Sequence, residues 1–125
     1  MASTSPVPPL RILCLEDNPL IVFHLEHMIE DLGHVFCGAL ESFEQLRDSS
    51  LQLEIDVALV DIDLADGSTG PAAARWLLDQ GVPAIFITGQ KDVAERNADA
   101  VVATLIKPIS TEHLRHSLEL IQAGR

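Results

Sequence analysis

The feature that most constrains the fold is a fivefold alternation between short apolar runs and longer segments of helical character. Each strand-plus-helix unit takes about 20 to 25 residues. Alternation of this kind is typical of a parallel sheet with helices on both faces, so we predict an α/β fold. The predicted strands are 11–15, 34–40, 55–60, 82–87 and 101–106, and the helices after them begin near Pro19, Ser42, Pro71, Lys91 and Ser110.

Helical periodicity is clearest after Pro19 and after Ser110. Apolar residues recur at helical spacing on one face of each segment, and Gly33 ends the first one. The inward residues are Ile21, Leu25, Met28, Ile29 and Leu32 in the first helix, and Leu114, Leu118 and Ile121 in the last, where Glu112 and Glu119 lie outward. Residues 91–100 hold few large apolar side chains, so we expect a short or mobile helix there.

The size of the chain fits one domain. Its 125 residues are too few for two domains, and 47% are hydrophobic, which is enough to form a core. Residues 1–9 contain three prolines and small polar residues. We expect them to be a flexible tail, with residues 10–125 forming the domain.

The net charge of −11 would repel a phosphate backbone, so nucleic-acid binding is not expected. No apolar stretch reaches the roughly 18 to 20 residues that span a membrane, and no signal peptide is evident. Cys14 and Cys37 lie in apolar runs and are interpreted as buried thiols without a redox motif. These features predict a cytoplasmic protein.

Polar side chains follow four of the predicted strands. The carboxyl ends of parallel strands meet at one edge of a sheet, where ligands bind near the topological switch point. We therefore expect these side chains to share one crevice. They are Glu16 and Asp17, Asp61 and Asp63, Thr88, and Lys107.

Several carboxylates held a few ångströms apart are costly unless a cation lies among them. Sites with oxygen ligands alone favour Mg²⁺, which binds carboxylates, water and phosphate oxygens. A threonine and a lysine beside the ion can hold the other oxygens of a phosphoryl group. This set predicts phosphoryl transfer onto a carboxylate.

On these residues the chain resembles the response-regulator receiver domains of bacterial two-component signalling, from residue 11 to about residue 122. The resemblance rests on Glu16-Asp17, Asp61, Thr88 and Lys107-Pro108. The intervals fit as well: 44 residues from Asp17 to Asp61, 27 to Thr88 and 19 to Lys107. It implies a flavodoxin-like doubly wound (βα)5 fold with strand order 2-1-3-4-5.

The resemblance also implies a role for each residue. Asp61 would be the phospho-acceptor, loaded from a phosphohistidine on a sensor histidine kinase or a histidine phosphotransfer protein. Mg²⁺ would be bound by Asp17, by Asp61 itself, by Glu16 through water and by the backbone carbonyl of Asp63. The remaining roles would be phosphoryl binding by Lys107 and Thr88, and a cis peptide bond before Pro108.

The chain departs from the family where most receivers carry an aromatic switch residue, because that position is Thr104. The run 86–90, Phe-Ile-Thr-Gly-Gln, is similar to a receiver subgroup that is marked by Phe-Ala-Thr-Gly and lacks the aromatic switch. The fourth helix of that subgroup tends to be mobile. We therefore hypothesise that phosphorylation orders or re-docks residues 89–100.

Asp63 is a second departure, because methionine or a similar residue is common there. Its carboxylate could deter small phosphodonors by charge, or it could position water and alter dephosphorylation. The sequence does not choose between the two.

Other polar and aromatic residues have plainer interpretations. The histidine pairs lack a carboxylate or cysteine partner at ligand spacing and are expected to be solvated. They are His24 with His27, and His113 with His116. Trp76 is expected to pack rather than to recognise a ligand.

The leading functional prediction is a stand-alone binding module, regulated by phosphorylation and not an enzyme beyond assisting its own phosphorylation and dephosphorylation. The chain starts with Met1 and ends soon after the last predicted helix, so no DNA-binding output domain is expected. The signal would be altered protein binding, or onward phosphotransfer, through the face of the fourth helix, fifth strand and fifth helix. Homodimers through that face are common in the family, and an excised receiver is a further possibility.

Two alternatives stay open. A degenerate receiver would bind partners without phosphorylation. A haloacid dehalogenase-type phosphatase would use Asp61 and Asp63 as nucleophile and acid. However, that aspartate pair normally follows the first strand, whereas this one follows the third, and Glu16 and Asp17 would then have no role.

Overall fold

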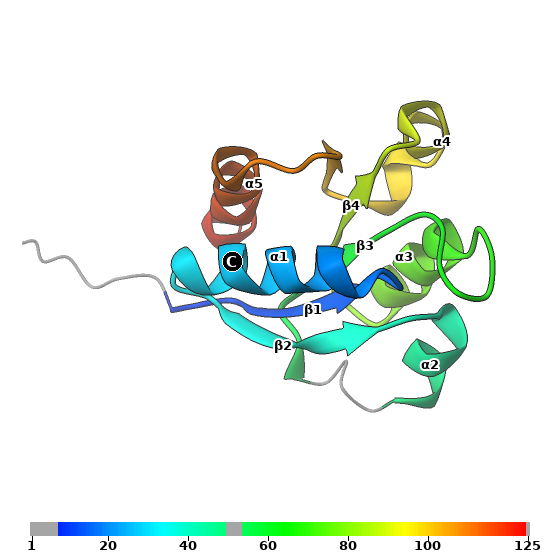
Figure 1. Cartoon of the computed structure of the whole chain (residues 1–125), viewed down its shortest axis with the longest axis horizontal. Coiled ribbons are helices and arrows are strands. Elements are labelled where there is room, and N and C mark those ends of the chain that lie inside the picture. The colour runs from blue at the N-terminus through cyan, green and yellow to red at the C-terminus, as the bar shows by residue number, and fades with distance from the viewer. Residues whose placement is uncertain (1–7, 50–53, 125) are drawn as a thin grey trace, which may run out of the picture.

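The computed structural model describes residues 8–49 and 54–124 and contains one five-stranded parallel sheet in the order β2-β1-β3-β4-β5 (Figure 1). The predicted fold class and strand order are confirmed. The strands are β1 Arg11–Leu15, β2 Val35–Leu40, β3 Val57–Val60, β4 Ala84–Thr88 and β5 Ala103–Ile106. The helices are α1 Pro19–Asp31, α2 Phe43–Asp48, α3 Gly70–Asp79, α4 Lys91–Arg96, the 3-10 helix η2 Ala98–Ala100 and α5 Thr111–Ala123.

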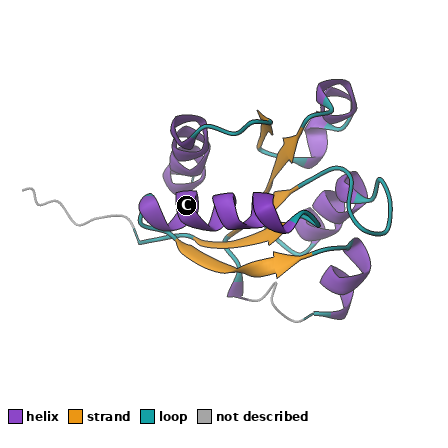
Figure 2. Ribbon diagram, viewed as in Figure 1, coloured by secondary structure: helices purple, strands orange, loops and turns teal. Residues whose placement is uncertain are grey.

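Helices cover both faces of the sheet, and the strands run between them (Figure 2). Successive residues of a strand face opposite sides. In β1, Ile12 and Cys14 pack with α1 and α5, whereas Leu13 and Leu15 pack with α2, α3 and α4. Both layers need apolar side chains, so every residue of β3 and β4 is buried, as their continuous apolar runs predict.

The predicted helix boundaries have local causes. The Ser42 hydroxyl accepts a hydrogen bond from the Gln45 N–H at 3.0 Å, and the Ser110 hydroxyl accepts one from the His113 N–H at 3.1 Å. These caps fix the starts of α2 and α5. Gly33 follows α1 with a φ of +86°, a left-handed conformation that favours glycine.

Four strands begin later than the sequence predicts, and the backbone N–H groups at two of the predicted starts bond to a preceding helix. Val82 is buried, but its N–H donates to the Leu77 carbonyl at the end of α3. Val101 likewise donates to Ala98 in η2. Apolar runs therefore overestimated the lengths of the strands.

The segment expected to be a short helix is two short helices, α4 and η2. Ala94 is the one buried residue of α4, which agrees with the thin apolar content of its sequence. The helix α4 is therefore mostly exposed, whereas α5 buries Leu114, Leu118 and Ile121 as predicted.

Trp76 packs edge-on against Phe43, with ring centroids 6.4 Å apart, as expected of a packing residue. Cys14 is buried, but Cys37 is only half-buried because it lies on the edge strand β2, and both are free thiols. The prediction of two core cysteines was thus wrong for Cys37.

The predicted tail, residues 1–9, lies outside the described residues except for Pro8 and Pro9, which are both exposed. No helix in the described part of the chain combines the length and apolar character needed to cross a bilayer.

Candidate functional site

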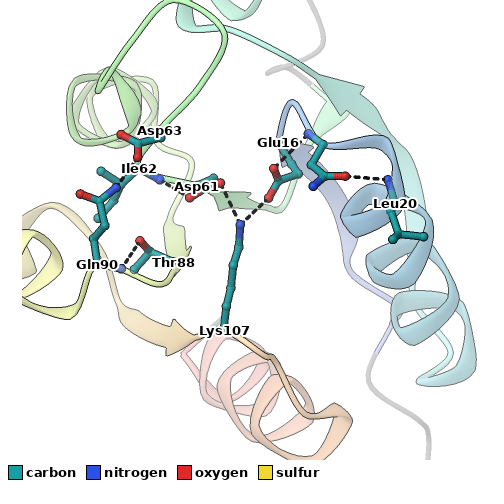
Figure 3. Close-up of polar contacts among 9 residues, drawn as sticks. Glu16, Leu20, Asp61, Ile62, Asp63, Thr88, Gln90 and Lys107 are labelled. Atoms are coloured by element: carbon teal, nitrogen blue, oxygen red, sulfur yellow. Dashed lines mark hydrogen bonds and ion pairs between the residues drawn. The ribbon is translucent and has the colours of Figure 1, made fainter.

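Three side chains that follow separate strands meet at the carboxyl edge of the sheet (Figure 3). The Lys107 ammonium, after β5, donates to Glu16 Oε1 at 3.0 Å and to Asp61 Oδ2 at 2.9 Å. Glu16 follows β1 and is 2% exposed, and Asp61 follows β3 and is 7% exposed. β1 pairs with β3, and β4 joins β3 to β5, so the parallel sheet brings together residues far apart in sequence.

Asp17 completes a group of three carboxylates. One oxygen each from Glu16, Asp17 and Asp61 lie within 4.8 Å of one another, and no other such cluster of metal-ligating side chains occurs in residues 8–49 and 54–124. Asp17 is exposed, which leaves that side of the group open to water. Oxygen-only donors with access to water are the environment that Mg²⁺ prefers, so the residues fit this ion.

Burial and ion pairing have opposite effects on the pKa values in this group. Burial raises the pKa of Glu16, although the hydrogen bonds from Lys107 and from the Asn18 N–H act in the other direction. Burial would lower the pKa of Lys107, but its contacts with Asp61 and Glu16 outweigh burial and raise it. Lys107 is therefore a cation between two carboxylates at neutral pH.

The backbone holds the Asp61 carboxylate from the side opposite Lys107. The Ile62 N–H donates to Asp61 Oδ1 at 2.7 Å. The start of α3 also lies against this residue, because a Cβ on Gly70 would lie 2.1 Å from the Asp61 carbonyl oxygen. Only glycine fits so close to another backbone, which makes Gly70 a requirement for this arrangement.

Thr88 and Asp63 are both linked to Gln90, in the loop after β4 (Figure 3). Thr88 is fully buried, and its Oγ1 accepts a hydrogen bond from the Gln90 N–H at 2.9 Å. The exposed Asp63 carboxylate accepts from the Gln90 side-chain amide and from the Ser68 hydroxyl, the latter at 3.0 Å. The structure thus joins the two loops that border Asp61.

The loop between β3 and α3 is also tied to α2. Asp66 accepts hydrogen bonds from the N–H groups of Phe43 and Glu44 at 3.2 and 3.1 Å, and from the Thr69 hydroxyl at 2.7 Å. The Thr69 bond and these backbone bonds lower the pKa of Asp66. The loop after Asp61 is therefore hydrogen-bonded to Gln90 through Asp63 and to the start of α2 through Asp66.

On β5, Thr104 is half-buried and stands opposite Phe86 of β4 in the strand register. No aromatic ring occupies this position. The peptide bond between Lys107 and Pro108 is cis.

A cavity of about 380 Å³ adjoins Lys107 between α1 and the loop before α5. Its lining is mostly apolar. The lining residues are Ile21, His24, Leu25, Met28, Lys107, Pro108 and Ile109.

The four histidines that were predicted to be solvated, His24, His27, His113 and His116, are all exposed.

Sequence reasoning did not assign Gln90, Gly70 or Asp66 to the site. In the sequence, Gln90 stands out only as the last residue of the run 86–90. Its side-chain amide reaches Asp63, 27 positions away, which no local pattern indicates. Gly70 offered a local signal, because a glycine directly before a helix-opening proline is a place where backbones approach closely.

Comparison with known proteins agrees with this geometry. The chain is 43% identical to the phyllosphere-induced regulator PhyR of Methylorubrum extorquens over 80 residues, which cover 62% of this chain and 30% of PhyR. The solution structure of the PhyR receiver domain of Erythrobacter litoralis superposes with a TM-score of 0.80 at 30% identity, covering 90% of this chain and 89% of that one.

A receiver domain crystallised with magnesium in its active-site cleft, from the sensor histidine kinase PA1611 of Pseudomonas aeruginosa, has a TM-score of 0.76 at 25% identity. The match covers 93% of this chain and 99% of that one. The family model described as the response regulator receiver domain matches residues 12–119. The chain therefore belongs to the response regulator receiver domain family.

Proposed function

We propose that the chain is a phospho-accepting receiver in which Asp61 takes a phosphoryl group from a phosphohistidine on a partner protein. The observation that carries the proposal is the contact of the nearly buried Asp61 carboxylate with the Lys107 ammonium, beside two further carboxylates. Such a set neutralises the charge of a transferring phosphoryl group and positions its acceptor.

In the proposed step, an Asp61 carboxylate oxygen attacks the phosphorus in line with the phosphorus–nitrogen bond of the phosphohistidine. A phosphorus–oxygen bond forms, the phosphorus–nitrogen bond breaks, and its electron pair returns to the imidazole. Lys107 then transfers its hydrogen bond from Asp61 Oδ2 to a phosphoryl oxygen. Thr88 contributes its hydroxyl to another phosphoryl oxygen.

Glu16, Asp17, Asp61 and the Asp63 carbonyl are the residues that would hold Mg²⁺. The ion would supply charge neutralisation between these carboxylates and the incoming phosphoryl oxygens. The crowding of three carboxylates within 4.8 Å beside one ammonium supports this assignment.

The phosphodonor is proposed to be a sensor histidine kinase or a histidine phosphotransfer protein. The cavity beside Lys107 offers it a mostly apolar surface next to the acceptor. The output is proposed to be a change in protein binding, or onward phosphotransfer. The exposed apolar residues Val102 and Ile106, next to and within β5, and Leu120 of α5 favour a protein partner or a second copy of the chain.

We further propose a regulatory rather than an enzymatic role, in the cytoplasm, with no nucleic-acid contact. The chain spans 30% of the length of the PhyR relative, so these statements concern the receiver function alone. The phosphatase alternative is disfavoured because both Asp63 oxygens are engaged, by Ser68 and Gln90.

A backbone NMR titration tests the proposal. Mg²⁺ is added first, and beryllofluoride, which mimics an aspartyl phosphate, is added second. We expect Mg²⁺ to shift amides around Asp17 and Asp61, and beryllofluoride to shift Thr88 and the residues that follow it. Asp17→Asn should weaken the Mg²⁺ response. An absence of response near Asp61 to both additions would instead favour the degenerate receiver.

A further inference from the structure

The helix α4 has little of its own to hold its start in place. Its N-cap residue, Gln90, makes no side-chain cap hydrogen bond, and Ala94 is the one buried residue of the helix. A six-residue helix without a cap is marginal in water, so its position depends on contacts from outside the helix.

Gln90 supplies those contacts at the N-terminal end. Its backbone N–H donates to the buried Thr88 Oγ1 at 2.9 Å, and its side-chain amide donates to the Asp63 carboxylate. One residue therefore ties the start of α4 to both side chains that flank the phospho-acceptor. Figure 3 shows Gln90 between Thr88 and Asp63.

The other end of this segment has a separate anchor. The Arg75 guanidinium of α3 forms two hydrogen bonds with the Asp99 carboxylate, at 3.0 and 3.1 Å, and one with the Asn97 side chain at 3.3 Å. These hydrogen bonds of Arg75 do not involve the site around Asp61. The segment 90–100 is thus held at two ends, and only the Gln90 end contacts the phosphoryl site.

We propose that Gln90 is a latch that holds α4 against the unphosphorylated site and is released when Thr88 turns toward a phosphoryl group. This inference rests on the proposed function, because it requires phosphorylation of Asp61. Thr88 Oγ1 cannot stay on the Gln90 N–H while its side chain rotates toward Asp61. The start of α4 then loses one of the two hydrogen bonds that Gln90 makes, and the segment moves about the hydrogen bonds of Arg75.

The latch accounts for the absence of the aromatic residue at Thr104. Where β5 carries no ring to follow the threonine, the movement of Thr88 needs another route out of the site. The bond from the Gln90 N–H to Thr88 is such a route, and it leads directly into α4.

The first part of the test needs neither metal nor phosphate. Amide hydrogen exchange of Lys91–Arg96 is measured in wild type, Gln90→Ala, Asp63→Ala and the double variant, with Gln80→Ala as the control at an exposed glutamine. Each latch variant should raise exchange about three- to tenfold, as loss of one exposed hydrogen bond to a charged group predicts, and Gln80→Ala should not. The double variant should match the larger single effect. Effects that add fully, or that equal the control, would overturn the latch.

The second part adds Mg²⁺ and beryllofluoride. In wild type, exchange across α4 should rise as the Thr88 bond breaks, and Gln90→Ala, which lacks the Asp63 bond but keeps its backbone N–H on Thr88, should rise to a higher level still. Unchanged exchange across α4 in wild type, with resonance shifts showing that the mimic is bound at Asp61, would overturn the latch alone. A lack of shifts at both Asp17 and Asp61 would contradict the proposed function, and the signalling role of the latch with it.

Discussion

Lys107 is the residue that balances the charge of the site. It lies between two carboxylates that are almost completely shielded from water, and its own side chain is 24% exposed. Lys107→Met should leave Glu16 and Asp61 to repel each other. We expect the free energy of unfolding at neutral pH to fall by about 1–3 kcal/mol, less than for a completely buried pair because Lys107 is partly solvated.

Urea unfolding with and without Mg²⁺ measures this effect. Mg²⁺ should stabilise Lys107→Met more than wild type, because the added cation replaces the lost one among the carboxylates. Arg11→Met serves as the control, since Arg11 pairs with Glu54 and Asp56 away from the site. Equal unfolding free energies for wild type and Lys107→Met would contradict the assigned role.

His34 gives the fold a pH dependence that is independent of the site. The Leu10 N–H donates to His34 Nδ1 at 3.0 Å, so this nitrogen must be unprotonated, and burial lowers the pKa of His34 from its ordinary value of 6.5. The unfolded chain therefore binds a proton more readily than the folded one. This contribution to stability is present above pH 6.5 and is lost as the pH falls through the lowered pKa.

The measurement is the free energy of unfolding of wild type and His34→Leu as a function of pH. The difference between the two proteins should be largest above pH 6.5 and should shrink as the pH falls below it. Comparing the two proteins cancels the titration of other groups. A difference that does not change with pH would show that folding leaves the pKa of His34 unchanged.

At the scale of elements, the start of α3 and the loop that carries Asp61 form one unit. Gly70 is buried in it, where a Cβ would meet the Asp61 carbonyl oxygen at 2.1 Å and the Ile62 Cα at 2.5 Å. Both atoms belong to the backbone, so neither can move without displacing the acceptor. Gly70→Ala should destabilise the protein by about 2–4 kcal/mol and weaken Mg²⁺ binding together with it.

Gly124→Ala is the matched control, because its Cβ would make only ordinary contacts of 3.7 Å with Ile121 and Leu120 carbonyls. Thermal unfolding and Mg²⁺ titration of the two variants test the prediction. If Gly70→Ala behaved as Gly124→Ala does, the close approach at Asp61 would not be required.

Over the whole molecule, burial and chain order were predictable because they depend on regular patterns. The alternation of segments predicted the sheet, and the strand ends predicted that Glu16, Asp61 and Lys107 would meet. Strands were predicted to begin too early, because a residue such as Val82 can be buried while its N–H bonds to a helix.

The connections between loops could not be predicted from the sequence. Gln90 reaches Asp63, and Asp66 reaches the start of α2, through hydrogen bonds that depend on how two loops lie in space. Polar side chains in loops carry no periodic signal. The roles of these residues therefore follow from geometry alone.

We propose that Asp61 accepts a phosphoryl group from a phosphohistidine. The most direct measurement incubates the protein with a phosphorylated histidine phosphotransfer domain and Mg²⁺, reduces any acyl phosphate with borohydride, and maps the modified residue by peptide mass spectrometry. We predict modification at position 61 in wild type and in Asp63→Asn, none in Asp61→Asn, and a loss of transfer when Mg²⁺ is chelated. Modification at Asp17 or Asp63, or no transfer from donors that load other receivers, would contradict the account.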